Sequence, residues 1–148
     1  DGHHVAFESL ASSLVNGDTN GFLDVFVHDL SSGLTERVSV SQGGTQGDLG
    51  SIACCGQVIS ADGRYVAFNS DATHLVKGSV AEDNVYVRDR AAGVTTLESV
   101  ASDGTPADGG SGFPRISADG SVVAFSSDAT NLVPGDTNKR SDVFVRTR

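Results

Sequence analysis

The sequence predicts an all-β fold in which one four-stranded antiparallel unit recurs along the chain. Asp-Gly followed by Val-Ala-Phe occurs three times, as DGHHVAF from residue 1, DGRYVAF from residue 62 and DGSVVAF from residue 119. After each copy come a Leu-Val pair and an alternating run, DVFV, NVYV or DVFV, in the same order. The chain has 18 glycines and no clear 3.6-residue apolar period. Repetition with this composition favours strands and turns over helices.

Each unit is predicted to hold four short strands. The first covers Ile-Ser before Ala-Asp-Gly, and the Asp-Gly makes a tight hairpin, because glycine accepts positive φ and aspartate bonds its own backbone. Val-Ala-Phe is the second strand, and Val-Phe-Val or Val-Tyr-Val is the third. A turn with Gly33 or Gly93 leads to the fourth, residues 37–40 in the first copy. We expect Val66 and Phe68 of the middle copy to point to one face, since side chains alternate along a strand.

The strand count predicts the architecture. The order along the chain gives three strands, then four, then three, because the first unit has no first strand and the last has no fourth. Apolar residues on both faces suit a sheet packed between like sheets, which is the arrangement of a β-propeller blade. We expect one propeller segment over residues 1–148, with repeat units 1–61, 62–118 and 119–148, or about two and a half blades of a larger or oligomeric propeller.

Several segments carry a resemblance to a known family. ISADGRYVAFNSDATHLV, NLVPGDTN and DVFVRTR resemble the WD40-like (PD40) repeats of TolB-type β-propellers, in the long-repeat form of secreted bacterial proteins. The resemblance extends over essentially the whole chain, with its motifs in register. It implies a propeller in a bacterial protein that is secreted, periplasmic or on the cell surface. It implies no single activity, since such propellers serve as scaffolds, binding platforms and enzyme domains.

Charge and hydropathy narrow the partners. The chain has 19 acidic and 10 basic residues and a net charge of −9, which repels phosphate backbones, so we expect no nucleic-acid partner. No run approaches the roughly 18 apolar residues of a membrane span, so we expect no membrane insertion. The expected partners are the remaining blades of the same propeller or neighbouring chains, which would cover unpaired strand edges at residues 5–7 and 143–145. A protein or glycan ligand is left open.

The connection between the second and third strands of a unit carries the candidate site. It runs from residue 8 to residue 23 in the first copy, and loops of this length are usually functional. Its pattern Asp-x-Asn-x-x-x-Asp recurs in the last copy, with oxygen donors at positions 1, 3 and 7 as at the start of a calcium loop. The six candidate calcium ligands are Asp18, Asn20, Asp24, Asp136, Asn138 and Asp142.

An alternative to calcium is turn chemistry, in which Asp and Asn side chains bond backbone N–H groups without a metal. The middle copy supports it in part, because Ser79 and Asn84 stand where the other copies have aspartates. A fold that needed a metal in every blade would not permit that exchange. We expect the first and last loops to be equivalent cation-compatible turns and the middle loop to differ.

No catalytic motif stands out. GGSGF ends in Phe113 where a nucleophile elbow needs glycine, and SQGGTQGDLGS has no Gly-Lys of a phosphate loop. The four histidines are not spaced as a zinc cluster with the adjacent cysteines, Cys54 and Cys55. That pair is either two small residues near a strand start or a strained vicinal disulfide. We therefore expect a non-catalytic scaffold or binding module, with the propeller domain of a larger hydrolase as the alternative.

Overall fold

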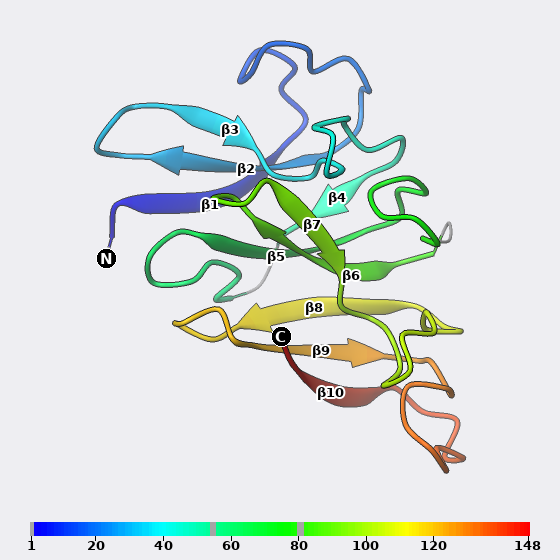
Figure 1. Cartoon of the computed structure of the whole chain (residues 1–148). Helices are drawn as coiled ribbons and strands as arrows, with labels where there is room; N and C mark the ends of the chain where they lie inside the picture. Colours follow the sequence, from blue (N-terminus) through cyan, green and yellow to red (C-terminus); the bar gives the residue numbers. More distant parts are fainter. Residues whose placement is uncertain (1, 54–55, 80–81) are drawn as a thin grey trace.

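The computed structural model describes residues 2–53, 56–79 and 82–148, and in these ranges it contains ten strands in three antiparallel sheets (Figure 1). The first sheet holds β1 (His4–Ser9), β2 (Asp24–Asp29) and β3 (Thr35–Arg37). The second holds β4 (Ser51–Ile52), β5 (Tyr65–Ser70), β6 (Asn84–Asp89) and β7 (Val94–Leu97). The third holds β8 (Ser111–Ile116), β9 (Val122–Ser127) and β10 (Asp142–Thr147).

Within each sheet the strands lie in chain order, each antiparallel to the next. The predicted sequence of three, four and three strands is confirmed, as is the all-β class with a complete four-stranded blade in the middle. β1 and β10 are edge strands, as the repeat predicted. No helix long and apolar enough to cross a membrane occurs among the described residues.

In the second and third blades, the first strand begins earlier than the sequence predicted. β8 already starts at Ser111 and bulges between Gly112 and Arg115 before it reaches Ile116. In the middle sheet the same strand is interrupted, because β4 pairs with the end of β5 and pairing resumes only at the bridge from Ile59 to Val66. Cys54 and Cys55, the adjacent pair singled out in the sequence, lie outside the described residues.

The sheets pack face to face around two cores. The first core joins the first and second sheets and includes Val25, Val27, Phe68 and Tyr86, none more than 1% exposed. The second core joins the second and third sheets and includes Val85, Val87, Phe125 and Ile116. Along β5, Val66 and Phe68 enter the first core and Ala67 enters the second, which confirms that the alternating side chains serve both faces. The middle sheet is therefore packed on both sides, as a propeller blade is.

The three blades repeat the same internal contacts. A stacked aromatic pair joins the second and third strand of each blade, with ring centroids 5.7 Å apart for Phe7–Phe26, 5.6 Å for Phe68–Tyr86 and 5.9 Å for Phe125–Phe144. In the first and second cores the aromatic pair of one blade covers the valines of the blade before it.

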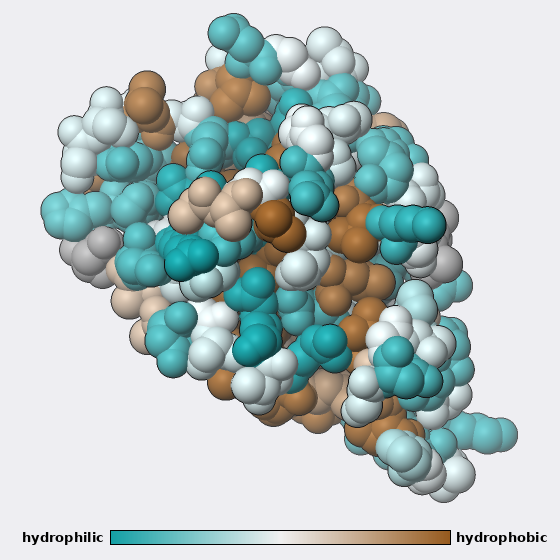
Figure 2. Space-filling view, viewed as in Figure 1, coloured by the Kyte–Doolittle hydropathy of each residue, from teal (hydrophilic) through white to brown (hydrophobic). Residues whose placement is uncertain are grey.

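The outward face of the third blade is apolar and uncovered. Val143 and Val145 are 75% and 69% exposed, whereas Val85 and Val87, at the same places in the second blade, are fully buried. Figure 2 shows apolar residues at the lower edge of the view, where Figure 1 places β10.

Candidate functional site

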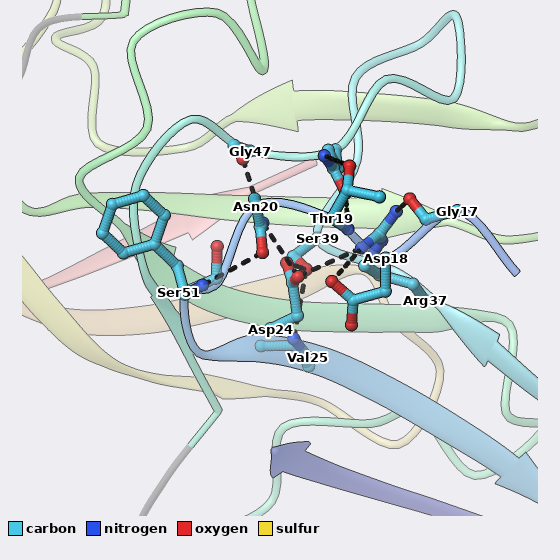
Figure 3. A network of polar contacts seen from close by, with 12 residues as sticks. Gly17, Asp18, Thr19, Asn20, Asp24, Val25, Arg37, Ser39, Gly47 and Ser51 are labelled. Carbon is cyan, nitrogen blue, oxygen red and sulfur yellow. Dashed lines mark hydrogen bonds and ion pairs between the residues drawn. The ribbon is translucent and has the colours of Figure 1, made fainter. Parts of the chain in front are cut away.

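The candidate loop of the first blade ends where two strands of the sheet meet. Asp24 is the first residue of β2 and Arg37 is the last residue of β3. Because these strands are antiparallel neighbours, with Phe26 opposite Arg37, the start of one strand lies beside the end of the other. The preceding loop, with Asp18 and Asn20, folds onto this point (Figure 3).

A guanidinium group lies between the two carboxylates of the loop. Arg37 Nη1 is 3.1 Å from Asp18 Oδ1 and 3.2 Å from Asp24 Oδ2 (Figure 3). Arg37 Nη2 donates a hydrogen bond of 3.3 Å to the carbonyl of Gly17. The side chains of Arg37, Asp18 and Asp24 are 8%, 4% and 0% exposed. Buried charges of like sign require a counter-charge, and here the chain supplies it from β3.

The amide of Asn20 presents its nitrogen, and not its oxygen, to Asp24. Nδ2 donates to Asp24 Oδ2 at 2.9 Å and to the carbonyl of Gly47 at 3.0 Å, while Oδ1 accepts the backbone N–H of Phe22 at 3.0 Å. The second oxygen of Asp24 is also engaged, because Ser39 Oγ donates to Oδ1 at 2.5 Å. The amide oxygen thus caps a turn, which is the alternative that the sequence left open.

The structure brings Asp18, Asn20 and Asp24 together around the guanidinium of Arg37. Calcium takes six to eight oxygen ligands, whereas these oxygens accept hydrogen bonds from a guanidinium, an amide and a hydroxyl. Sequence reasoning missed Arg37, which supplies one positive charge to the two carboxylates.

The middle blade changes all three charged positions at once. Leu97 lies opposite Tyr86 as Arg37 lies opposite Phe26, and Ser79 and Asn84 replace the two aspartates. Asn84 Nδ2 donates instead to the carbonyl of Glu82 at 2.6 Å. Both carboxylates and the guanidinium are exchanged together for neutral side chains, so they behave as one electrostatic unit. This coupled exchange is the signal from which the role of Arg37 could have been found.

The third blade keeps the loop and its carboxylates. Asn138 Nδ2 donates to Asp142 Oδ2 at 2.7 Å, and the N–H of Arg140 donates to Asn138 Oδ1 at 2.8 Å, the same pattern as in the first blade. In the part of the chain that the structure describes, no strand pairs with the outer edge of β10. No described residue therefore takes the place of Arg37. Asp136, Asn138 and Asp142 instead line an open groove of about 630 Å³.

Acidic side chains also fasten each blade to the next. Asp48 accepts the N–H and hydroxyl of Thr73 at 2.8 and 2.6 Å, and Asp108 does the same with Thr130 at 2.6 and 2.8 Å. The hydroxyl and N–H of Thr130 lower the pKa of Asp108. Burial works against ionisation of Asp48, but the Thr73 bonds still hold its pKa below the usual value. Carboxylates in these connections thus serve the packing of blades.

A buried glutamate joins the second and third blades. Glu98 is 3% exposed. Its two oxygens lie 3.1 Å from Arg146 Nε and 3.1 Å from Arg148 Nε. The equivalent residue of the first blade is Val38, which enters the first core, so the same place between blades is filled by an apolar side chain or by an ion cluster.

The histidines lie in structural contacts. His28 Nδ1 is 2.9 Å from Thr35 Oγ1, and His74 Nδ1 is 3.2 Å from Asp48 Oδ1. Among the described residues no three His, Cys, Asp or Glu side chains converge as a metal site. The polar side chains of these loops hold turns and blade junctions together.

The chain was compared with known protein families, sequences and structures, and only solved structures resemble it. No protein-family model matches the chain, and no curated protein sequence is similar to it. TolB from Acinetobacter baumannii has a similar structure over 87% of this chain and 25% of that chain, with 20% sequence identity and a TM-score of 0.48. The chain thus spans about a quarter of the length of that neighbour. The assignment of three successive propeller blades rests on the strand pairing and the two blade cores.

Proposed function

We propose that this chain is a non-catalytic scaffold and binding module, built from β-propeller blades, of a secreted, periplasmic or cell-surface bacterial protein. The contrast between blades carries the proposal. The valines of the second blade are buried under the aromatic pair of the third, and the same valines of the third blade are exposed. A surface of this shape is built to stack against another blade, from the same polypeptide or from a neighbouring chain. The bacterial, extracytoplasmic setting is supported by the resemblance of the repeats.

The stacking surface is tested by sedimentation of the purified chain. We expect concentration-dependent association, because the uncovered face of Val143 and Val145 would find a blade face on a second molecule. Val143→Asp combined with Val145→Asp should reduce it, since a charge opposes desolvation of the face. Leu34→Asp is the matched control, because Leu34 is 71% exposed near the turn between β2 and β3. A monomer at all concentrations, indifferent to the paired aspartates, would refute the stacking role.

Calcium binding stays a prediction from the sequence, and it is most direct for the third loop, where no described guanidinium bonds the carboxylates. Melting curves with calcium and with a chelator test it. A ligand at a hundredfold excess over its Kd stabilises by about 2.7 kcal/mol, and Asp142→Asn should remove the gain. Identical curves under both conditions would leave the loop as a turn whose side chains bond the backbone.

A further inference from the structure

We propose that the outer edge of β10 is a receptor for an antiparallel strand that carries arginine and serine two residues apart, and that Asp136 and Asp142 bind the arginine. The inference rests on the proposed function, since it specifies how a further strand completes the third blade. Strand addition to a free sheet edge is a common mode of recognition, in which the backbone gives affinity and side chains give specificity.

The other two blades show which edge is completed. β2 pairs with β3 along one side and β6 pairs with β7 along the same side. β10 holds the equivalent place and, among the described residues, pairs only with β9. Phe26 of β2 is fully buried beneath this arrangement, whereas Phe144 of β10 stays half-buried. The third blade thus presents the surface that the first two blades cover with a strand.

In the first and second blades, a serine that follows the last strand makes the same contacts with the strand beside it. The N–H of Val25 donates to Ser39 Oγ at 3.1 Å, and the N–H of Val85 donates to Ser99 Oγ at 3.1 Å. Each hydroxyl in turn donates to the side chain that opens the neighbouring strand, Asp24 or Asn84. Both blades therefore fix their last strand by the same serine, and the third blade offers the matching N–H and carboxylate at residues 143 and 142.

The arginine accompanies only the paired aspartates. In the first blade Arg37 bridges Asp18 and Asp24. In the middle blade, where both aspartates are absent, Leu97 takes its place. The third blade has the aspartates, so the strand that completes it should have arginine opposite Phe144. A guanidinium bound to two carboxylates makes charge-assisted hydrogen bonds that a leucine cannot replace.

Space and charge in the third blade agree with such a strand. The groove of about 630 Å³ runs along β10 and is lined by Asp136, Asn138, Asp142 and Phe144. In the first blade, Arg37 and Ser39 contact the aspartates at the matching positions of the loop and of β2. The two carboxylates in this groove favour a strand that carries a cation at a fixed register.

The chain itself supplies a probe and a control. A labelled peptide of residues 33–41, GLTERVSVS, represents the arginine type, and one of residues 93–101, GVTTLESVA, represents the leucine type. Binding to the whole chain is measured by fluorescence anisotropy in the presence of a chelator. We expect the first peptide to bind at least tenfold more tightly than its own Arg37→Leu version and than the second peptide. An Arg37→Lys version of the peptide keeps the charge but lacks the forked donors of the guanidinium, so its affinity should lie between those of the arginine and leucine versions.

Variants of the protein separate the carboxylates from general charge. Asp136→Asn with Asp142→Asn should reduce binding of GLTERVSVS to the level of its leucine version, while Asp128→Asn, an exposed carboxylate of the same blade, should not. Equal binding of all peptides would overturn the arginine receptor and leave blade completion intact. If no peptide binds but the chain still associates in sedimentation, the arginine receptor is overturned and the proposed function stands. No binding together with a permanent monomer would overturn the proposed function as well.

Discussion

A single arginine decides the electrostatics of the first loop. Arg37 is the only cation within reach of two buried aspartates among the residues the structure describes. Arg37→Leu copies the middle blade at one position and leaves Asp18 and Asp24 without a counter-charge. Removal of one partner from a buried ion pair costs about 3–5 kcal/mol. We expect a loss of that size in the free energy of unfolding, measured with denaturant.

The middle blade defines the control for this change. Asp18→Ser and Asp24→Asn, added to Arg37→Leu, remove the whole electrostatic unit and copy Ser79, Asn84 and Leu97. Replacement of a complete buried ion cluster by neutral residues is often nearly neutral, so the triple variant should recover most of the lost stability. A triple variant as unstable as Arg37→Leu would show that the three residues do not act as a unit.

Hairpin aspartates determine how the fold responds to acid. Hydrogen bonds from the hydroxyl of Ser117 and from Ser121 lower the pKa of Asp119 to about 2. Because this folded-state pKa lies below the usual 3.8, the stability that Asp119 contributes is complete above about pH 4 and is lost as the pH falls through about 2. Asp119→Asn should therefore destabilise at pH 7, and its difference from wild type should shrink towards pH 2.

Asp71 is the control, because its pKa is shifted in the opposite direction from that of Asp119. Burial, followed by the nearby charge of Asp83, raises the pKa of Asp71. Its ionised form therefore opposes folding at pH 7, and Asp71→Asn should be neutral or stabilising there. Urea unfolding midpoints of both variants at pH 7 and pH 3 make the comparison. A constant deficit of Asp119→Asn at both pH values would contradict the role of its carboxylate.

The spacing of residues in the sequence predicted which side chains of the loop lie close together, but it did not predict which cation pairs with the two aspartates. Asp18, Asn20 and Asp24 lie close in sequence, and their shared loop makes convergence predictable. Arg37 is brought to them only by the pairing of β2 with β3, a tertiary contact whose partner in the middle copy is leucine. Spacing within one loop cannot reveal a charge that arrives from another strand.

At the scale of strands, the same substitution at matching positions of two blades distinguishes the stability gained from core packing from the intrinsic strand preference of valine. Val85 and Val143 occupy the same place in β6 and β10, but the first is fully buried and the second is 75% exposed. Val85→Ala removes two methyl groups from the second core and should cost about 2–3 kcal/mol. Val143→Ala should change the free energy of unfolding by less than about 0.5 kcal/mol at concentrations where the chain does not associate. Equal losses would mean that the exposed face of β10 is covered.

Strand order followed from the repeat, whereas the length of the first strand in each unit did not. The second and third strands carry uninterrupted apolar runs such as Val-Ala-Phe, because both of their faces lie in blade cores, and these runs are visible in the sequence. β4 has only two residues, Ser51 and Ile52, and β8 starts with Ser111 and Gly112. Their pairing is set by the neighbouring strand, so apolar periodicity could not locate their ends.

At the scale of the whole molecule, stability should decline from the middle blade outwards. In a repeat stack each unit is stabilised by its own contacts and by its neighbours, and among the three described blades the middle one is packed on both faces. We expect amides of β5 and β6 to be the slowest to exchange with deuterium, and those of β1 and β10 to exchange through local opening.

The ion cluster of Glu98 should set how tightly the third blade is held. Glu98 is buried between Arg146 and Arg148, so Glu98→Gln leaves two guanidinium groups without their counter-charge and weakens only this junction. Exchange should accelerate in β8 to β10, while β1 to β3 keep their rates, because nearest-neighbour coupling confines the loss to the adjoining units. Glu36→Gln is the control, since Glu36 also pairs with an arginine, Arg90, but its side chain is 49% exposed, and exposed pairs contribute little. Uniform acceleration in all three blades would show that the molecule opens as one cooperative unit and not blade by blade.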